Sequence, residues 1–266
     1  MLGVQLTHRN IVAQICQWEI HFLPFHKDLK AKGLQTSLPG VLPTSHAGGI
    51  CVHISLPLRT GLQIHMLPRF NLEQMLDIVE RDQLTCIFHS PPVFLLFTQP
   101  GFPREKIRSV RYAMSGAAPL SKSLQQRVTK VLYNGTKLAT NWGMTEVVAV
   151  ATMYPAGKEV TDGSVGVLLP GMEAKVVDTV SGEELGAGQR GELLVKGTSD
   201  GRSFVLIIGP NVTMGYYKNP EANAAALEGP WLHTGDIAIV EQNGSIYIVD
   251  RLKVYQKPNL RSDDRN

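Results

Sequence analysis

The feature that most constrains the fold is an alternation of helical patterns with short apolar strands in the middle of the chain. Residues 72–83 (LEQMLDIVERDQ) and 121–132 (SKSLQQRVTKVL) have apolar side chains at helical spacing. Short apolar runs at 85–90, 109–116 and 137–146 lie between or after them and end in small or polar residues. This alternation is typical of a parallel α/β sheet, and it predicts that loops meet at the carboxyl edge of the sheet, where such sheets bind ligands.

Two further segments precede this alternation. Residues 8–20 are predicted to form a helix that is capped by Thr7 or Asn10. Residues 40–49 (GVLPTSHAGG) are predicted to form a strand that runs into a glycine-rich loop.

The second half of the chain has a different pattern. From about residue 160, short alternating strands are separated by glycine and Asn-Gly turns, as in antiparallel sheets. We therefore expect an α/β protein with a parallel-sheet subdomain at 1–160, a β-rich subdomain at 161–250 and a divergent tail at 251–266.

Composition excludes several functional classes. The chain has 266 residues, of which 43% are hydrophobic, and 26 basic and 23 acidic residues give a net charge of +3. So small an excess does not favour nucleic acid as a partner. Cys16, Cys51 and Cys86 are too few and too far apart for a disulfide framework and indicate free thiols in a reducing compartment.

No targeting or membrane signal is visible in the sequence. The longest apolar runs, at 93–97 and 204–208, have the length of strands, well below the ~18 residues that a membrane helix needs. The first residues lack the apolar core of a signal peptide, and the ending SDDRN is not a peroxisomal tripeptide. We expect an intracellular protein, cytoplasmic or peroxisomal, without an integral membrane segment.

The stretch NWGMTE (141–146) combines groups that suit a nucleotide. Trp142 could stack on a base, Gly143 allows close backbone approach, and the Thr145 hydroxyl suits a phosphate oxygen. The Glu146 carboxylate is a hard oxygen ligand of the kind that Mg²⁺ takes. The alternative is a strand end followed by a capping threonine and a solvated glutamate.

Four other places carry candidate residues, each with a simpler structural interpretation. Small residues at 115–119 (SGAAP) permit a flat ligand, although most such segments are ordinary turns. Asp236 in WLHTGD could accept hydrogen bonds from a ribose diol or could cap its own turn. Arg251 could pair with phosphate or ribose, whereas Lys253 could be solvated charge. His46 beside glycines suits a substrate pocket, although a lone histidine is more often structural.

Taken in order, the motifs resemble those of one family. They are SGAAPL, NWGMTE, GSVGVLLPGMEAKVVD, GELLVKG, NVTMGYYKNPEA, WLHTGD and YIVDRLK. Their order and spacing are similar to those of the adenylate-forming acyl-CoA ligases, a group that includes 4-coumarate–CoA ligases, fatty acyl-CoA ligases and firefly luciferase. The resemblance extends from Gly3 to about Lys253.

The resemblance implies an activity and a set of site residues. The family uses ATP and Mg²⁺ to convert a carboxylic acid to an acyl-adenylate and then transfers the acyl group to coenzyme A. Thr145 would contact phosphate, Glu146 would hold Mg²⁺, His46 would lie near the substrate carboxylate and Lys253 would be the hinge of a C-terminal lid. The nucleotide would be bound by Gly116, Ala117, Ala118, Asn141, Trp142, Gly143, Met144, Asp236 and Arg251. The acid stays open: medium-chain, aryl and secondary-metabolite acids all fit, and the oligomeric state is not indicated.

The sequence also departs from the family pattern. Leu2 stands where the family has the lysine of its phosphate loop, and residues after Lys253 do not resemble the family's lid. Residues 198–209 (TSDGRSFVLIIG) interrupt the pattern, which suggests a retained intron or a changed splice site. Two hypotheses follow: an acyl-CoA or aryl-CoA ligase, truncated at both ends and impaired as written, or a catalytically inactive remnant that serves as a nucleotide-binding or interaction module or is an incomplete gene model.

Overall fold

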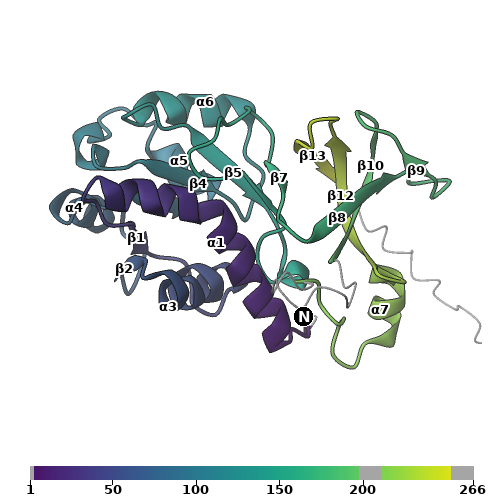
Figure 1. Cartoon of the computed structure of the whole chain (residues 1–266). Coiled ribbons are helices and arrows are strands. Elements are labelled where there is room, and N and C mark those ends of the chain that lie inside the picture. Colours follow the sequence, from purple (N-terminus) through teal and green to yellow (C-terminus); the bar gives the residue numbers. More distant parts are fainter. Residues whose placement is uncertain (1–2, 198–210, 253–266) are drawn as a thin grey trace, which may run out of the picture.

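The computed structural model describes residues 3–197 and 211–252, which form two larger sheets, one two-stranded sheet and the helices that cover them (Figure 1). The helices are α1 (His8–Ala31), α2 (Ala47–Gly49), η1 (Ile50–Ser55), α3 (Leu56–Thr60), α4 (Leu72–Arg81), α5 (Pro91–Leu96), η2 (Arg104–Ile107), α6 (Lys122–Val131), η3 (Thr145–Val147) and α7 (Pro220–Ala226). The strands are β1 (Ser37–Gly40), β2 (Gln63–Met66), β3 (Cys86–His89), β4 (Tyr112–Ser115), β5 (Leu138–Trp142), β6 (Thr152–Met153), β7 (Val167–Leu168), β8 (Met172–Val177), β9 (Glu184–Leu185), β10 (Arg190–Gly197), β11 (Leu227–Glu228), β12 (Trp231–Val240) and β13 (Ile246–Arg251).

The first sheet has the strand order β3-β4-β5-β6-β7. Strands β3, β4 and β5 are parallel, and β6 and β7 add antiparallel pairs at one side. Ser115 at the end of β4 pairs with Thr140 near the end of β5. The predicted parallel sheet is therefore confirmed, and the loops that follow β4 and β5 leave the same edge.

The strands of this sheet are buried on both faces, as short apolar strands between helices should be. On one face, Phe22 of α1 packs edge-on against Phe88 of β3 and Tyr112 of β4, at ring-centroid distances of 5.9 and 5.3 Å. On the other face, Ile87 and Ala113 join a second core with side chains of α4, α5 and α6. Alternate residues of each strand thus serve two cores, with α1 below the sheet and α6 above it in Figure 1.

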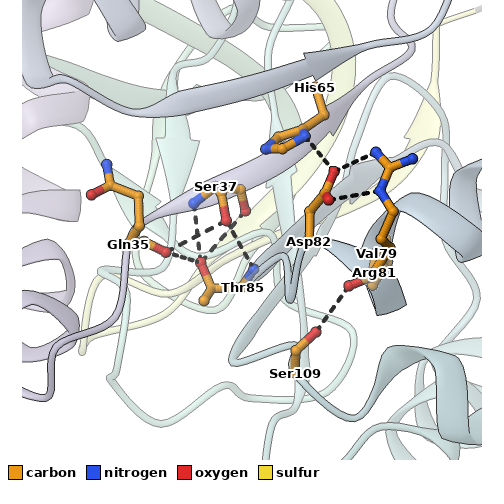
Figure 2. Close-up of polar contacts among 8 residues, drawn as sticks. All are labelled: Gln35, Ser37, His65, Val79, Arg81, Asp82, Thr85 and Ser109. Atoms are coloured by element: carbon orange, nitrogen blue, oxygen red, sulfur yellow. Dashed lines mark hydrogen bonds and ion pairs between the residues drawn. The ribbon is translucent and has the colours of Figure 1, made fainter.

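A small parallel sheet, β1-β2, adjoins this first sheet through polar contacts (Figure 2). The Thr85 hydroxyl, just before β3, donates to the carbonyl of Gln35 at 3.0 Å and accepts from the amide of Ser37 at 3.1 Å. Nearby, Asp82 accepts two hydrogen bonds from Arg81 and lies 2.9 Å from Nδ1 of His65. These contacts join the start of β1 to the amino end of β3.

The second sheet is antiparallel. Its order is β11-β12-β10-β8-β9, with β13 also paired to β12, and it lies beside the first sheet in Figure 1. The Asn-Gly turn between β12 and β13 contains Gly244 at a φ of +81°, a conformation that glycine adopts without strain. The predicted β-rich second half is confirmed, and the change from the first sheet to the second falls between Leu168 and Met172. That the two halves are separate subdomains stays a prediction.

Two local expectations are corrected, and the apolar run at 93–97 is assigned to an element. Helix α1 continues to Ala31, past the expected end at 20 and through Pro24, because Phe22, Phe25 and Leu29 bury one face of its second half. The expected glycine-rich loop after β1 is helical from Ala47 onward. The apolar run 93–97, which has the length of a strand, lies mostly in α5.

Two predicted features fall outside the described residues: the interruption at 198–209 and the hinge residue Lys253. Within residues 3–197 and 211–252, no helix is both long and apolar enough to cross a bilayer.

Candidate functional site

A cavity of about 380 Å³ lies where the carboxyl edge of the first sheet meets β12 and β13. Its walls come from segments far apart in the chain: α1, the α2–η1 region, the ends of β3, β4 and β5, and strands β12 and β13. Ten residues that the sequence singled out line it: His46, Gly116, Ala117, Asn141, Gly143, Met144, Thr145, Glu146, Asp236 and Arg251. The fold thus brings residues from across the chain to one place.

The loop after β5 is compact and strained. A Cβ on Gly143 would lie 2.0 Å from the carbonyl oxygen of Ala149 and 2.6 Å from Cα of Val150, so this position requires glycine for chain packing. Val148 has a φ of +72°, which a β-branched residue adopts at a cost of about 1–3 kcal/mol. The loop therefore holds a strained conformation that its surroundings must fix.

Part of that support comes from the segment that begins at Asn211. The Asn211 side chain is fully buried and donates to the carbonyl of Val147 at 3.0 Å, and the Thr213 amide donates to the carbonyl of Glu146 at 2.7 Å. The Tyr216 hydroxyl donates to Oε1 of Glu146 at 2.8 Å. Burial, together with this carboxylate, raises the pKa of Tyr216 to about 12, so the phenol stays a donor.

Glu146 is suited to hold Mg²⁺ with help from a ligand. No cluster of three or more His, Cys, Asp or Glu side chains occurs in the described parts of the chain. A cation here would therefore take one protein carboxylate and complete its coordination with phosphate oxygens and water, which is the way in which Mg²⁺ is commonly bound. The Thr145 hydroxyl lines the same wall.

The turn after β4 forms a flat wall of small residues. A Cβ on Gly116 would lie 2.0 Å from Oδ1 of Asn141, so the Asn141 amide packs directly on the glycine backbone. Ala117 has a φ of +67°, the left-handed region, and borders the cavity. The buried Oδ1 of Asn141 and Oγ of Ser115 lack hydrogen-bond partners among the described residues, a feature expected at a ligand site.

His46 begins the helical segment that follows β1. It is the N-cap of α2, and its Nδ1 accepts a hydrogen bond from the amide of Gly48 at 3.0 Å. In the neutral ring the proton is then on Nε2, which leaves that atom as a donor. The glycines beside His46 lie in a helical turn, and Gly49 packs closely on the backbone, since a Cβ there would lie 2.0 Å from the carbonyl oxygen of Pro43.

Trp142 occupies a different position from the one expected for a stacking residue. Its side chain is 9% exposed and packs in the core, and it is not among the residues that line the cavity. Its indole Nε1–H donates to Oδ2 of Asp236 at 2.8 Å. Asp236 faces Arg251 across the β12–β13 pair, with 3.6 Å between Oδ1 and the arginine Nε.

One wall of the cavity is mainly apolar and was not predicted. It includes Trp18 of α1, Val52 of η1, Phe88 and His89 of β3, and Met114 of β4. Burial, with a smaller effect of the charge on His53, lowers the pKa of His89 to about 3, so this ring is neutral. The wall is assembled by tertiary packing of segments whose apolar residues look in sequence like ordinary core.

Several sequence predictions stay outside this cavity. Ala118 lies on the exposed turn beside Ala117 and is not in the lining. Tyr216 and Asn211, which support the Glu146 loop, were not predicted as functional, although both belong to the motif NVTMGYYKNPEA. A sequence motif includes such residues but does not predict which neighbouring residues they contact.

Comparisons with known proteins show what this chain is similar to in sequence and in fold. The family model described as "AMP-binding enzyme" matches residues 3–217. The chain is 31% identical over 253 residues to a probable 4-coumarate–CoA ligase 1 of Dictyostelium discoideum and 32% identical over 256 residues to a putative acyl-coenzyme A synthetase of Emericella nidulans. The fold resembles the crystal structure of ATP-bound MatB from Rhodopseudomonas palustris, with a TM-score of 0.79 and 26% identity.

These matches cover most of this chain but less than half of each relative. Both sequence matches span 94% of this chain, against 42% of the Dictyostelium protein and 43% of the Emericella protein. The structural match covers 94% of this chain and 45% of MatB. The activities named for those relatives belong to proteins more than twice as long.

Proposed function

The chain belongs to the AMP-binding enzyme family, and from this we propose that its cavity binds ATP and a carboxylic acid for acid–thiol ligation. The observation that supports this most is the gathering of ten residues singled out from the sequence, nine of them in the family motifs, around one cavity of about 380 Å³. The relatives include proteins named as 4-coumarate–CoA ligase and acyl-coenzyme A synthetase, so the reaction proposed is activation of an acyl or aryl acid and its transfer to coenzyme A.

The proposed reaction has two steps. In the first, a carboxylate oxygen of the acid attacks the α-phosphorus of ATP, an acyl–phosphate bond forms, and pyrophosphate leaves. In the second, the sulfur of coenzyme A attacks the acyl carbon, a thioester forms, and AMP leaves. The first step makes the poorly electrophilic carboxylate reactive by giving it a good leaving group.

Different walls of the cavity suit different parts of the two substrates. The apolar side at Trp18, Phe88 and Met114 suits the hydrocarbon part of the acid. The flat wall at Gly116 and Ala117 suits the adenine ring. The polar side then receives the ribose at Asp236 and the phosphates at Thr145 and Glu146, so the carboxylate and the α-phosphate would meet between the two sides.

Charge at the phosphate end decides how fast such chemistry can run. Mg²⁺ on Glu146 would offset negative charge on the phosphates during the displacement. Because Nδ1 of His46 accepts from the Gly48 amide, its Nε2 would donate to the acid carboxylate and hold it for attack. Arg251 is the one lysine or arginine among the described residues that line the cavity, and its side chain is 76% exposed.

That single cation favours a second candidate function. A site with one exposed arginine can bind a nucleotide, while phosphoryl displacement gains large rate factors from several positive groups around the phosphates. The second candidate is therefore a nucleotide-binding module that does not turn over.

ATP–pyrophosphate exchange and nucleotide binding together test both candidates. We expect exchange, with acyl and aryl acids supplied in turn, to fall at least about 100-fold in Glu146→Gln, because the metal ligand is lost. AMP binding measured by calorimetry without Mg²⁺ should change little in this variant. Glu159→Gln is the matched control, since the Glu159 side chain is 88% exposed and remote from the cavity lining.

The outcomes separate the candidates. Exchange that requires Glu146 supports the ligase. AMP binding without exchange in the full chain supports the nucleotide-binding module. Absence of AMP binding to the folded chain contradicts both.

A further inference from the structure

We propose that Trp142 is a positioning residue, which fixes the carboxylate of Asp236 for the hydroxyls of a bound ribose. The inference rests on the proposed nucleotide site. Its basis is the hydrogen bond from the indole Nε1–H to Oδ2 of Asp236, 2.8 Å long and joining residues 94 positions apart in the chain. This bond links β5 of the first sheet with β12 of the second.

The carboxylate has few other restraints. Its second oxygen, Oδ1, lies 3.6 Å from Nε of Arg251, which is longer than a hydrogen bond. The Arg251 side chain is 76% exposed, so solvent competes for this pair. Among the described residues, the indole of Trp142 is the one side chain within hydrogen-bond distance of the Asp236 carboxylate.

The indole itself is held firmly. Trp142 is 9% exposed and belongs to the larger hydrophobic core. Its backbone amide donates to Oγ1 of Thr152 at 3.2 Å, and its carbonyl accepts from the amide of Ala151 at 2.9 Å. A donor placed in this way transmits the rigidity of the first sheet to a side chain on the second.

The arrangement leaves acceptor capacity for a ligand. An ionised carboxylate offers about four lone-pair sites on its two oxygens, and the indole occupies one. The side chain of Asp236 is 13% exposed and lines the cavity, so the remaining sites can accept from two neighbouring hydroxyl groups. A carboxylate fixed before binding loses less entropy when the ribose arrives.

The first test compares two nucleotides in binding to the full chain by calorimetry. Adenosine 5′-monophosphate has both ribose hydroxyls, and its 2′,3′-dideoxy analogue has neither. We expect Trp142→Phe, which keeps an aromatic face and removes the donor, to weaken AMP binding roughly tenfold and to leave binding of the analogue nearly unchanged. If the ring acted through the base instead, both nucleotides would lose affinity equally, and the inference would be overturned.

A double-mutant cycle shows whether the tryptophan acts through the aspartate. Asp236→Ala should abolish the preference for AMP over the analogue, and adding Trp142→Phe to it should cost nothing further. Trp231→Phe is the matched control, because Trp231 begins the same strand, is absent from the cavity lining and contacts Lys175 and Lys196. Additive effects of the two site variants would contradict the inference.

A second measurement does not depend on any change at Trp142. The chain has three tryptophans, so a sample labelled with ¹⁵N-tryptophan gives three indole N–H signals. Trp231→Phe removes one signal, and Asp236→Asn is expected to shift one of the other two strongly. If neither of the two remaining indole N–H signals shifts in a folded Asp236→Asn variant, the hydrogen bond between Trp142 and Asp236 is contradicted. If the wild-type chain binds no AMP while this shift is seen, the proposed function fails and the indole contact stands.

Discussion

The two sheets contribute to the site in different ways. The first sheet is buried on both faces, and it supplies backbone and loop atoms from the carboxyl ends of β4 and β5. The second sheet is antiparallel and partly exposed, and it supplies side chains directly from paired positions, Asp236 opposite Arg251. The first sheet and its loops therefore set most of the shape of the cavity and supply Glu146, while the second sheet adds the charged pair Asp236 and Arg251.

The largest expected effect tests this difference in burial. Ile87→Ala on β3 removes a fully buried side chain and should lower the free energy of unfolding by about 3–4 kcal/mol. Ile248→Ala on β13 makes the same chemical change at a half-buried position and should cost about 1 kcal/mol. Denaturant titration of both variants gives the comparison. Equal losses would show that the second sheet is held as tightly as the first.

The next effect concerns the loop after β5. Gly143→Ala places a Cβ against the backbone of Ala149 and Val150, which cannot move without changing the strained loop. We expect a loss of about 2–3 kcal/mol in stability and a marked loss of AMP affinity. Gly186→Ala is the control, since its Cβ would meet nothing closer than Oε1 of Gln189 at 3.4 Å.

Denaturation and calorimetry on these two glycine variants separate packing from binding. A Gly143→Ala variant with wild-type stability and wild-type AMP binding would show that the loop adapts to the extra methyl group. The tight packing around Gly143 would then have no bearing on the shape of the cavity.

The two sheets also differ in their expected response to pH. Burial holds the pKa of His89 at about 3, so the folded state keeps this ring neutral while the unfolded chain takes up a proton below its ordinary pKa of about 6.5. The folded state therefore loses stability as the pH falls below about 6.5, by up to about 1.4 kcal/mol per pH unit. Burial lowers the pKa of His21 and His53 as well, in the same direction.

His233 on β12 behaves in the opposite way. Partial burial opposes its charge, but hydrogen bonds from its ring to the carboxylates of Glu192 and Glu228, both at 3.1 Å, raise its pKa. The stabilisation is complete below the unfolded pKa of about 6.5 and is lost as the pH rises through the higher folded pKa. Unfolding measured from pH 5 to 8 should thus show a shallower acid loss in His89→Leu and a steeper one in His233→Gln. Parallel curves for the two variants would contradict this assignment.

The sequence predicts the parts of this molecule that local patterns control. The alternation of helical patterns with short apolar segments is sufficient to predict the parallel strands. Every residue of β3 and β4 is buried, so these strands appear in the sequence as short, mostly apolar runs. The second half of α1 was missed because Pro24 and its polar neighbours hide the helical spacing of Phe22, Phe25 and Leu29. Glycines near His46 suggested a loop, whereas they lie in a helical turn in which Gly49 packs closely on Pro43.

Contacts between the two sheets produce no local pattern in the sequence. The motifs place Trp142 and Asp236 in one site, but their hydrogen bond joins residues 94 positions apart and depends on how two sheets pack. An aromatic residue in a nucleotide motif suggests stacking, and tertiary structure buries it instead. The residues that line a cavity can be predicted from motifs more readily than the support behind them.

The smallest expected effect concerns that support at Glu146. Tyr216→Phe removes the hydroxyl that donates to Oε1 of Glu146 at 2.8 Å and leaves the ring in place. One such hydrogen bond contributes about 0.5–1.5 kcal/mol, so binding of Mg²⁺·ATP should weaken roughly threefold while metal-free AMP binding stays constant. Tyr217→Phe is the matched control, because Tyr217 is 59% exposed and is absent from the cavity lining. Tighter Mg²⁺·ATP binding in Tyr216→Phe would reverse the interpretation: the phenol would then compete with the metal for the carboxylate, and the second half of the chain would restrain the site rather than support it.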